Sequence, residues 1–73
     1  MTYRMYQLDP KALSSEVETA LKQYQARYGY PPSILESGME MPLPKGMNLV
    51  TKIIDIPKNI ILLAVDVDTV SLE

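Results

Sequence analysis

Residues 48–67 read NLVTKIIDIPKNIILLAVDV and contain the most informative pattern in the chain. The second half includes six consecutive apolar residues, 60–65, with no polar residue among them. Because successive side chains of a strand point to opposite faces, a strand over this run presents apolar side chains on both faces. This pattern is typical of a central strand that is covered on both sides. We therefore expect residues 60–67 to form a central, buried strand.

The first half of the same stretch predicts another strand, over residues 49–56. Lys52 interrupts its apolar residues, so this strand is expected to be only half-buried. Between the two strands, Pro57 pre-sets the backbone of a turn, and Asn59 tolerates the left-handed conformation that closes a short connection. The two strands are therefore predicted to form a β-hairpin.

A helix over residues 15–28 is the clearest local prediction upstream of this stretch. Ser15 and Glu18 have the spacing of a capping box, in which each side chain accepts a hydrogen bond from a backbone amide at the helix start. Gly29 is expected to end the helix, because glycine adopts the left-handed backbone at low cost. Apolar residues recur at helical spacing and form one stripe: Val17, Ala20, Leu21, Tyr24 and Tyr28.

The remaining segments complete a small α+β domain over residues 1–71. Residues 1–8 and 33–36 are predicted strands, and residues 37–47 form a loop with two prolines and two glycines. The expected order is strand, helix, strand, loop and β-hairpin, with one helix packed on one face of a three- or four-stranded sheet. The final pair, Leu72 and Glu73, fits a cloning scar as well as a native ending.

The size of the chain points to a partner. With 73 residues it lies near the lower limit for a self-sufficient core, and one helix of about 14 residues, roughly 21 Å long, covers a single sheet face. The second apolar face is then expected to lie in a homodimer interface; the alternatives are that the methionine-rich loop covers it or that another protein does. The predicted interface residues are Met39, Met41, Leu49, Ile53, Ile61, Leu63 and Val65.

Composition excludes several classes of function. The chain has no cysteine and no histidine, which removes disulfides, thiolate nucleophiles and histidine acid–base catalysis. Its net charge of −2 comes from scattered charges, so we expect no nucleic acid or anionic membrane as a partner. No apolar stretch approaches the roughly 20 residues that span a bilayer, and no signal peptide is recognisable, so we expect a cytoplasmic protein without a cofactor.

Carboxylates are the remaining candidates for chemistry. Asp66 and Asp68 lie two apart near the end of the last predicted strand, so both would project from one face and could bind Mg²⁺ or Ca²⁺. The simpler interpretation of this pair is a solvated strand end. We predict a non-enzymatic interaction or structural module that acts as a homo-oligomer. The alternative is a small ligand- or metal-binding protein or enzyme with a carboxylate site at the subunit interface, built from Glu36, Glu40, Asp66 or Asp68.

Overall fold

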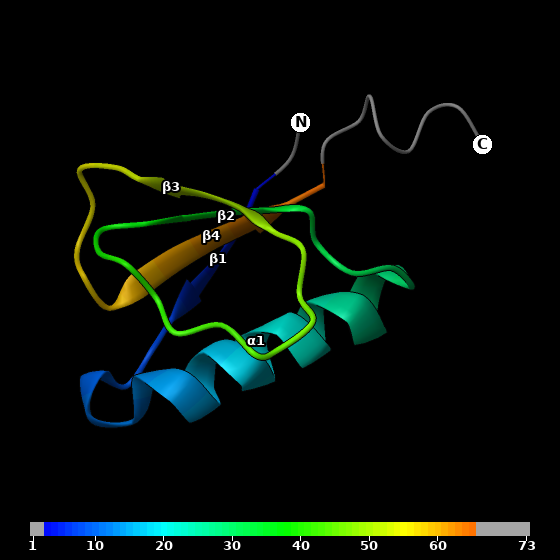
Figure 1. The fold of residues 1–73 in the computed structure, drawn as a ribbon, viewed down its shortest axis with the longest axis horizontal. Helices are drawn as coiled ribbons and strands as arrows, with labels where there is room; N and C mark the ends of the chain where they lie inside the picture. The colour runs from blue at the N-terminus through cyan, green and yellow to red at the C-terminus, as the bar shows by residue number, and fades with distance from the viewer. Residues whose placement is uncertain (1–2, 66–73) are drawn as a thin grey trace.

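The computed structural model describes residues 3–65 and has one α-helix packed with a four-stranded mixed sheet (Figure 1). This arrangement confirms the predicted α+β fold. The interpretation of Leu72 and Glu73 as a cloning scar concerns residues outside the described range. In chain order the elements are β1 (Arg4–Gln7), a 3-10 turn η1 (Pro10–Ala12), α1 (Leu13–Tyr28), β2 (Ile34–Ser37), β3 (Val50–Ile53) and β4 (Ile60–Ala64).

The apolar strand β4 lies inside the sheet, as predicted. The strand order is β1-β4-β2-β3, and β4 pairs in antiparallel fashion with both β1 and β2. Ile61 and Leu63 are completely buried. An interior position suits a strand without a polar residue, because both of its edges are paired and the row with Ile61 and Leu63 is buried.

The chain reverses direction between β3 and β4 at the predicted turn, where the Ile60 amide donates to the Pro57 carbonyl at 3.1 Å. The two strands are not direct neighbours, however. β3 pairs in parallel with β2, and β2 therefore separates β3 from β4. This corrects the prediction that the two C-terminal strands pair with each other. The physical reason is burial: Ile34 and Leu35 of β2 are buried, whereas every residue of β3 is exposed, so the more apolar strand takes the interior position.

Two parallel crossovers determine which face of the sheet is covered. The first connects β1 to β2 through α1, and the second connects β2 to β3 through residues 38–49. Both step across the sheet in the same direction. Because parallel crossovers are right-handed in nearly all proteins, the two connections must pass over the same face. Figure 1 shows the loop running beside α1 on one side of the sheet.

The core lies between this covered face and the two connections. Met41 of the loop is buried in the same cluster as the helix residues, and further loop side chains pack against that cluster. The loop thus covers the part of the face that α1 does not reach. The alternative that the loop closes the opposite face is therefore wrong, because a right-handed second crossover passes over the same face as α1. The buried cluster consists of Leu8, Val17, Ala20, Leu21, Tyr24, Leu35, Met41, Ile61 and Leu63.

The helix starts earlier than predicted and has a different cap. It begins at Leu13, and the Ser15 hydroxyl donates to the Ala12 carbonyl at 3.2 Å instead of accepting from an amide. The predicted capping box at Ser15 is therefore wrong. Pro10 begins a helical turn upstream, because its fixed backbone angle suits the first position of a helix.

Asp9 caps this upstream turn. Its Oδ1 accepts a hydrogen bond from the Lys11 amide at 2.9 Å, and its own amide donates to Glu16 Oε1 at 2.9 Å. These two bonds satisfy the amide just before the turn and one amide inside it, as the bonds of a capping box do. The predicted end of the helix is confirmed: Gly29 has φ of 80°, and its amide donates to the Gln25 carbonyl at 2.8 Å.

We expect Asp9→Ala to lower the free energy of unfolding by about 1 kcal/mol, because the substitution removes the side-chain acceptor of the cap. Ser15→Ala is the matched control and should change stability by much less, since its hydroxyl only donates to a carbonyl that the helix already uses. Urea denaturation followed by circular dichroism measures both. Equal losses for the two variants would contradict the assignment of the cap to Asp9.

Gly38 lies where the connection from β3 to β4 crosses the end of β2. A Cβ atom at this position would overlap the Ile56 carbonyl oxygen and lie 3.0 Å from the Pro57 carbonyl oxygen. Backbone atoms cannot move aside as a flexible side chain can, so this close approach requires glycine. The crossing is a direct result of the strand order, because the connection must pass β2 to reach β4.

Gly38→Ala is therefore expected to destabilise the protein by about 1 to 3 kcal/mol, as overpacking does. Gly46→Ala serves as the comparison: a Cβ there would have nothing within 4 Å, and only its positive φ of 85° opposes a side chain. Thermal unfolding of both variants tests this. A Gly38→Ala variant more stable than Gly46→Ala would show that the connection can move away from β2.

Candidate functional site

The face of the sheet opposite α1 is covered by none of the described elements, and we call it the open face. Strand registers assign its side chains, since residues opposite one another in paired strands share a face. The row that contains Ile61 and Leu63 belongs to the core, so the alternate residues form the open face. They are Tyr3, Met5, Gln7, Ile34, Glu36, Val50, Lys52, Ile60, Leu62 and Ala64.

The exposed apolar side chains of the open face lie on the two edge strands and next to them. Met5 is 63% exposed, Val50 is 59% exposed, and Tyr3 is 40% exposed. Between them, Ile34 and Ala64 are buried within the sheet. The open face thus exposes apolar side chains at both of its edges, on β1 and on β3.

The polar groups of the open face are few and mixed in sign. The Tyr3 hydroxyl donates to Glu36 Oε2 at 2.8 Å, which links β1 to β2 across β4. Lys52 is the register partner of Glu36 on β3 and makes no ion pair with any residue in the described range. The open face therefore carries one acid, one base, a phenol and the amide of Gln7, with the base available to another molecule.

Two tyrosines have raised pKa values for different reasons. The pKa of Tyr3 is raised above its ordinary value of 10.0, first by the hydrogen bond to Glu36 and then by desolvation and the negative charge of that carboxylate. The pKa of Tyr24 is raised mainly by desolvation, because its ring lies in the core, and secondarily by other tyrosines around it. Both environments favour the neutral phenol.

The structure places six of the seven predicted interface residues in the core or packed against it. Ile61 and Leu63 are fully buried under α1, and Met41 is buried with them. Ile53 is 67% exposed, but its register with Ser37 puts it on the helix side of β3. The other three, Met39, Leu49 and Val65, are partly buried against the core cluster. The assignment of this row to the second face is therefore corrected.

The cause of this correction is the symmetry of β4. A strand that is apolar on both faces gives no indication of which row meets the helix, and a shift by one residue exchanges the rows. Glu36 and Lys52 could have served as a signal, since charged residues favour the solvated face. Using them would have required knowing their register with β4, which only the assembled sheet shows.

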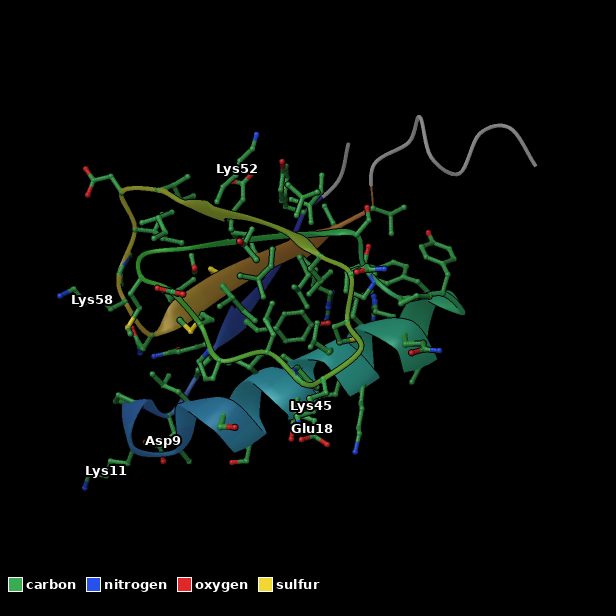
Figure 2. All side chains as sticks on the ribbon, viewed as in Figure 1. Asp9, Lys11, Glu18, Lys45, Lys52 and Lys58 are labelled. Carbon is green, nitrogen blue, oxygen red and sulfur yellow. The ribbon has the colours of Figure 1, made fainter. Side chains whose placement is uncertain are left out.

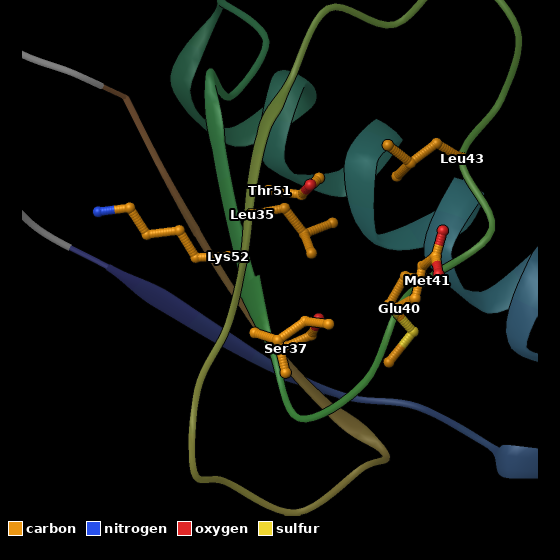
Figure 3. Close-up of a pocket in the computed structure, with 8 residues that line it drawn as sticks. Leu35, Ser37, Glu40, Met41, Leu43, Thr51 and Lys52 are labelled. Atoms are coloured by element: carbon orange, nitrogen blue, oxygen red, sulfur yellow. The ribbon is translucent and has the colours of Figure 1, made fainter.

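A hollow of about 420 Å³ lies on the helix side of β3, between that strand and the loop (Figure 3). This volume falls within the range of small ligand sites. Figure 3 shows Lys52 pointing away from the hollow, on the other side of β3 from Glu40 and Met41. The residues that line the hollow, Lys52 of β3 among them, are Leu35, Ser37, Glu40, Met41, Leu43, Thr51, Lys52 and Ile53.

The hollow has an apolar floor and a polar rim. Leu35 and Met41 are buried, while Glu40 is exposed. Ser37 is buried too, and its hydroxyl is already used, because it donates to the Met39 carbonyl. The hollow thus offers apolar contact area, with Glu40 as an exposed charged group at its edge.

The two candidate carboxylates within residues 3–65, Glu36 and Glu40, do not meet. Glu36 lies on the open face and Glu40 at the hollow, on the other side of the sheet. Asp66 and Asp68, the predicted metal ligands, lie outside the described residues. Within residues 3–65, no three acidic, histidine or cysteine side chains come close enough to hold a metal ion.

The charged side chains labelled in Figure 2 project in several directions. Lys11, Lys52 and Lys58 point away from one another, so they form no shared basic groove. No helix in residues 3–65 has the length and apolarity needed to cross a membrane.

Comparison of this chain with known protein families, with curated proteins and with solved structures finds no match. The surfaces described above are therefore the basis on which a function can be inferred.

Stability should fall as the pH rises above about 10. Below the ordinary tyrosine pKa of 10.0, folded and unfolded chains are both protonated at Tyr3 and Tyr24, and the full stabilisation is present. Above it, the unfolded chain releases these protons first, so the free energy of unfolding decreases until the folded tyrosines also ionise. Urea denaturation between pH 9 and pH 11 measures the slope. Glu36→Gln should reduce it, and an unchanged slope would contradict the role of Glu36.

Proposed function

We propose that this protein is a non-catalytic interaction module that acts as a homodimer, with the open face as the dimer interface. The observation that carries the proposal is the position of the two crossovers. Both α1 and the loop cover the same side of the sheet, which leaves the opposite side without a covering element in residues 3–65. A second copy would cover that face and enlarge a core that is small in a chain of 73 residues.

The energetic gain comes from the exposed apolar side chains. Burying a methionine or valine side chain of this kind is worth about 1.5 to 3 kcal/mol, so Met5 and Val50 are the main contributors from each copy. The area is modest. Adjacent strands lie roughly 5 Å apart, so a four-stranded sheet with strands of four to five residues offers less than the roughly 800 Å² per partner of a standard interface. We therefore expect a reversible, concentration-dependent dimer.

The charge pattern of the open face favours a second copy over a charged partner. Glu36 and Lys52 give the face no net charge, so two identical faces do not repel each other. In a two-fold symmetric interface the same patch is used by both subunits, and a patch with one acid and one base can be self-complementary. A strongly charged partner would find little to recognise on this surface. We keep the cytoplasmic location predicted from the sequence as part of the proposal, because a chain without cysteine needs no oxidising compartment.

Sedimentation equilibrium over a concentration series up to roughly 500 µM tests the proposal, since interfaces of this size give weak association. The native chain should move from monomer to dimer. Met5→Glu should shift the dissociation constant upward by at least about tenfold, because it would bury an unpaired charge in the interface.

Gln25→Glu is the control, since it adds the same charge at an exposed helix position. It should leave the association unchanged. A native chain that stays monomeric at the highest concentration would overturn the proposal. Equal weakening by both variants would show that net charge, and not the open face, controls association.

A further inference from the structure

The outer edge of β3 has backbone groups that point away from the sheet. The amides of Val50 and Ile54 donate to carbonyls of the β2 side at 2.9 and 2.8 Å. Because backbone groups alternate in direction along a parallel pair, the N–H and C=O groups of Thr51 and Ile53 face outward. β3 is the last strand in the sheet order, so none of the described strands pairs with these groups.

The hollow lies beside this edge and has the right position to receive side chains of an added strand. Thr51 and Ile53 present their side chains on the helix side of β3, where they line the hollow together with Met41 and Leu43. Residues placed opposite Thr51 and Ile53 in a new strand would project on this same side. The volume of the hollow, about 420 Å³, exceeds that of a single side chain. The residue opposite Lys52 would project on the open face.

We propose that the β3 edge binds an extended segment of another protein by strand addition, with the segment antiparallel to β3. The segment carries an acidic residue opposite Lys52 and an apolar residue on each side of that position. In this mode the backbone hydrogen bonds supply much of the affinity, and pockets for alternate side chains supply the specificity. The outward groups of Thr51 and Ile53 provide the hydrogen bonds, and the hollow provides the pocket.

Charges on the two sides of β3 determine which residues of the bound segment project on each side. Lys52 lies on one side without an ion-pair partner in the described residues, and Glu40 lies at the rim of the hollow on the other side. An acidic side chain is attracted to the first side and repelled from the second. The alternation of apolar and acidic residues in the bound segment must therefore match this arrangement.

The same lysine disfavours a second copy of this edge as the occupant. Two β3 strands that use all the outward groups of Thr51 and Ile53 in an antiparallel pair would place Lys52 directly opposite Lys52 of the other copy. Like charges in that position are destabilising. A lysine in the middle of an edge strand commonly protects it from pairing with itself, and it leaves the edge open to a strand with the opposite charge.

The outward backbone groups and the hollow of this edge lie away from the open face, and only Lys52 borders both surfaces, so strand addition does not require the proposed homodimer. NMR titration of the ¹⁵N-labelled full chain tests it, with the synthetic peptide acetyl-Thr-Thr-Val-Asp-Val-Thr-Thr-amide as the probe. We expect the largest shifts at the amides of Thr51 and Ile53. A peptide with lysine in place of aspartate should bind about fivefold more weakly, because like charges then face each other.

Two controls make the test specific. Lys52→Glu should reverse the preference, so that the lysine peptide binds more tightly than the aspartate peptide. A peptide methylated on its valine amides should lose binding to the native chain, because it cannot donate to the edge. The proposal is overturned by an absence of shifts at millimolar peptide, by equal affinity of the native chain for the aspartate and lysine peptides, or by undiminished binding of the methylated peptide.

Discussion

The handedness of the two parallel crossovers is the constraint on which the rest of this structure depends. β1 to β2 and β2 to β3 both step across the sheet in the same direction, and a right-handed connection must then use the same face each time. One connection is a helix and the other is a loop with three methionines. The loop can share the task of the helix because methionine side chains adapt to irregular apolar surfaces. Among residues 3–65, nothing covers the other face, and this results from topology and not from a lack of apolar residues.

The strand order also explains the local features that look unusual in isolation. Because β2 is inserted between β3 and β4, the connection of residues 54–59 must cross the end of β2, and this crossing requires Gly38. The same insertion puts β3 at the edge, where every one of its residues is exposed. Lys52 is tolerated there because its charge remains in water. A strand with this composition could not take the place of β4 without burying that charge.

The two candidate surfaces expose two different kinds of group. The open face has apolar side chains in contact with water. The free energy falls when any apolar surface covers Met5 and Val50. The β3 edge has backbone donors and acceptors, which require a partner strand with matching geometry. Binding at the open face therefore depends on the apolar area that is buried, and binding at the β3 edge depends on the direction of the backbone hydrogen bonds. The proposals for a homodimer and for strand addition rest on this difference.

The interior strand, the helix stripe and the end of the helix at Gly29 were all predictable from sequence, because each is a local pattern with a direct physical cause. The N-terminal cap of the helix was predicted at the wrong residue. Ser15 and Asp9 both offer a suitable oxygen, and only the turn that begins at Pro10 selects between them. Only the tertiary structure decided the order of the strands and the row of β4 that meets α1. The reason is that an apolar strand looks the same from both faces, and its orientation is set by register with strands distant in sequence.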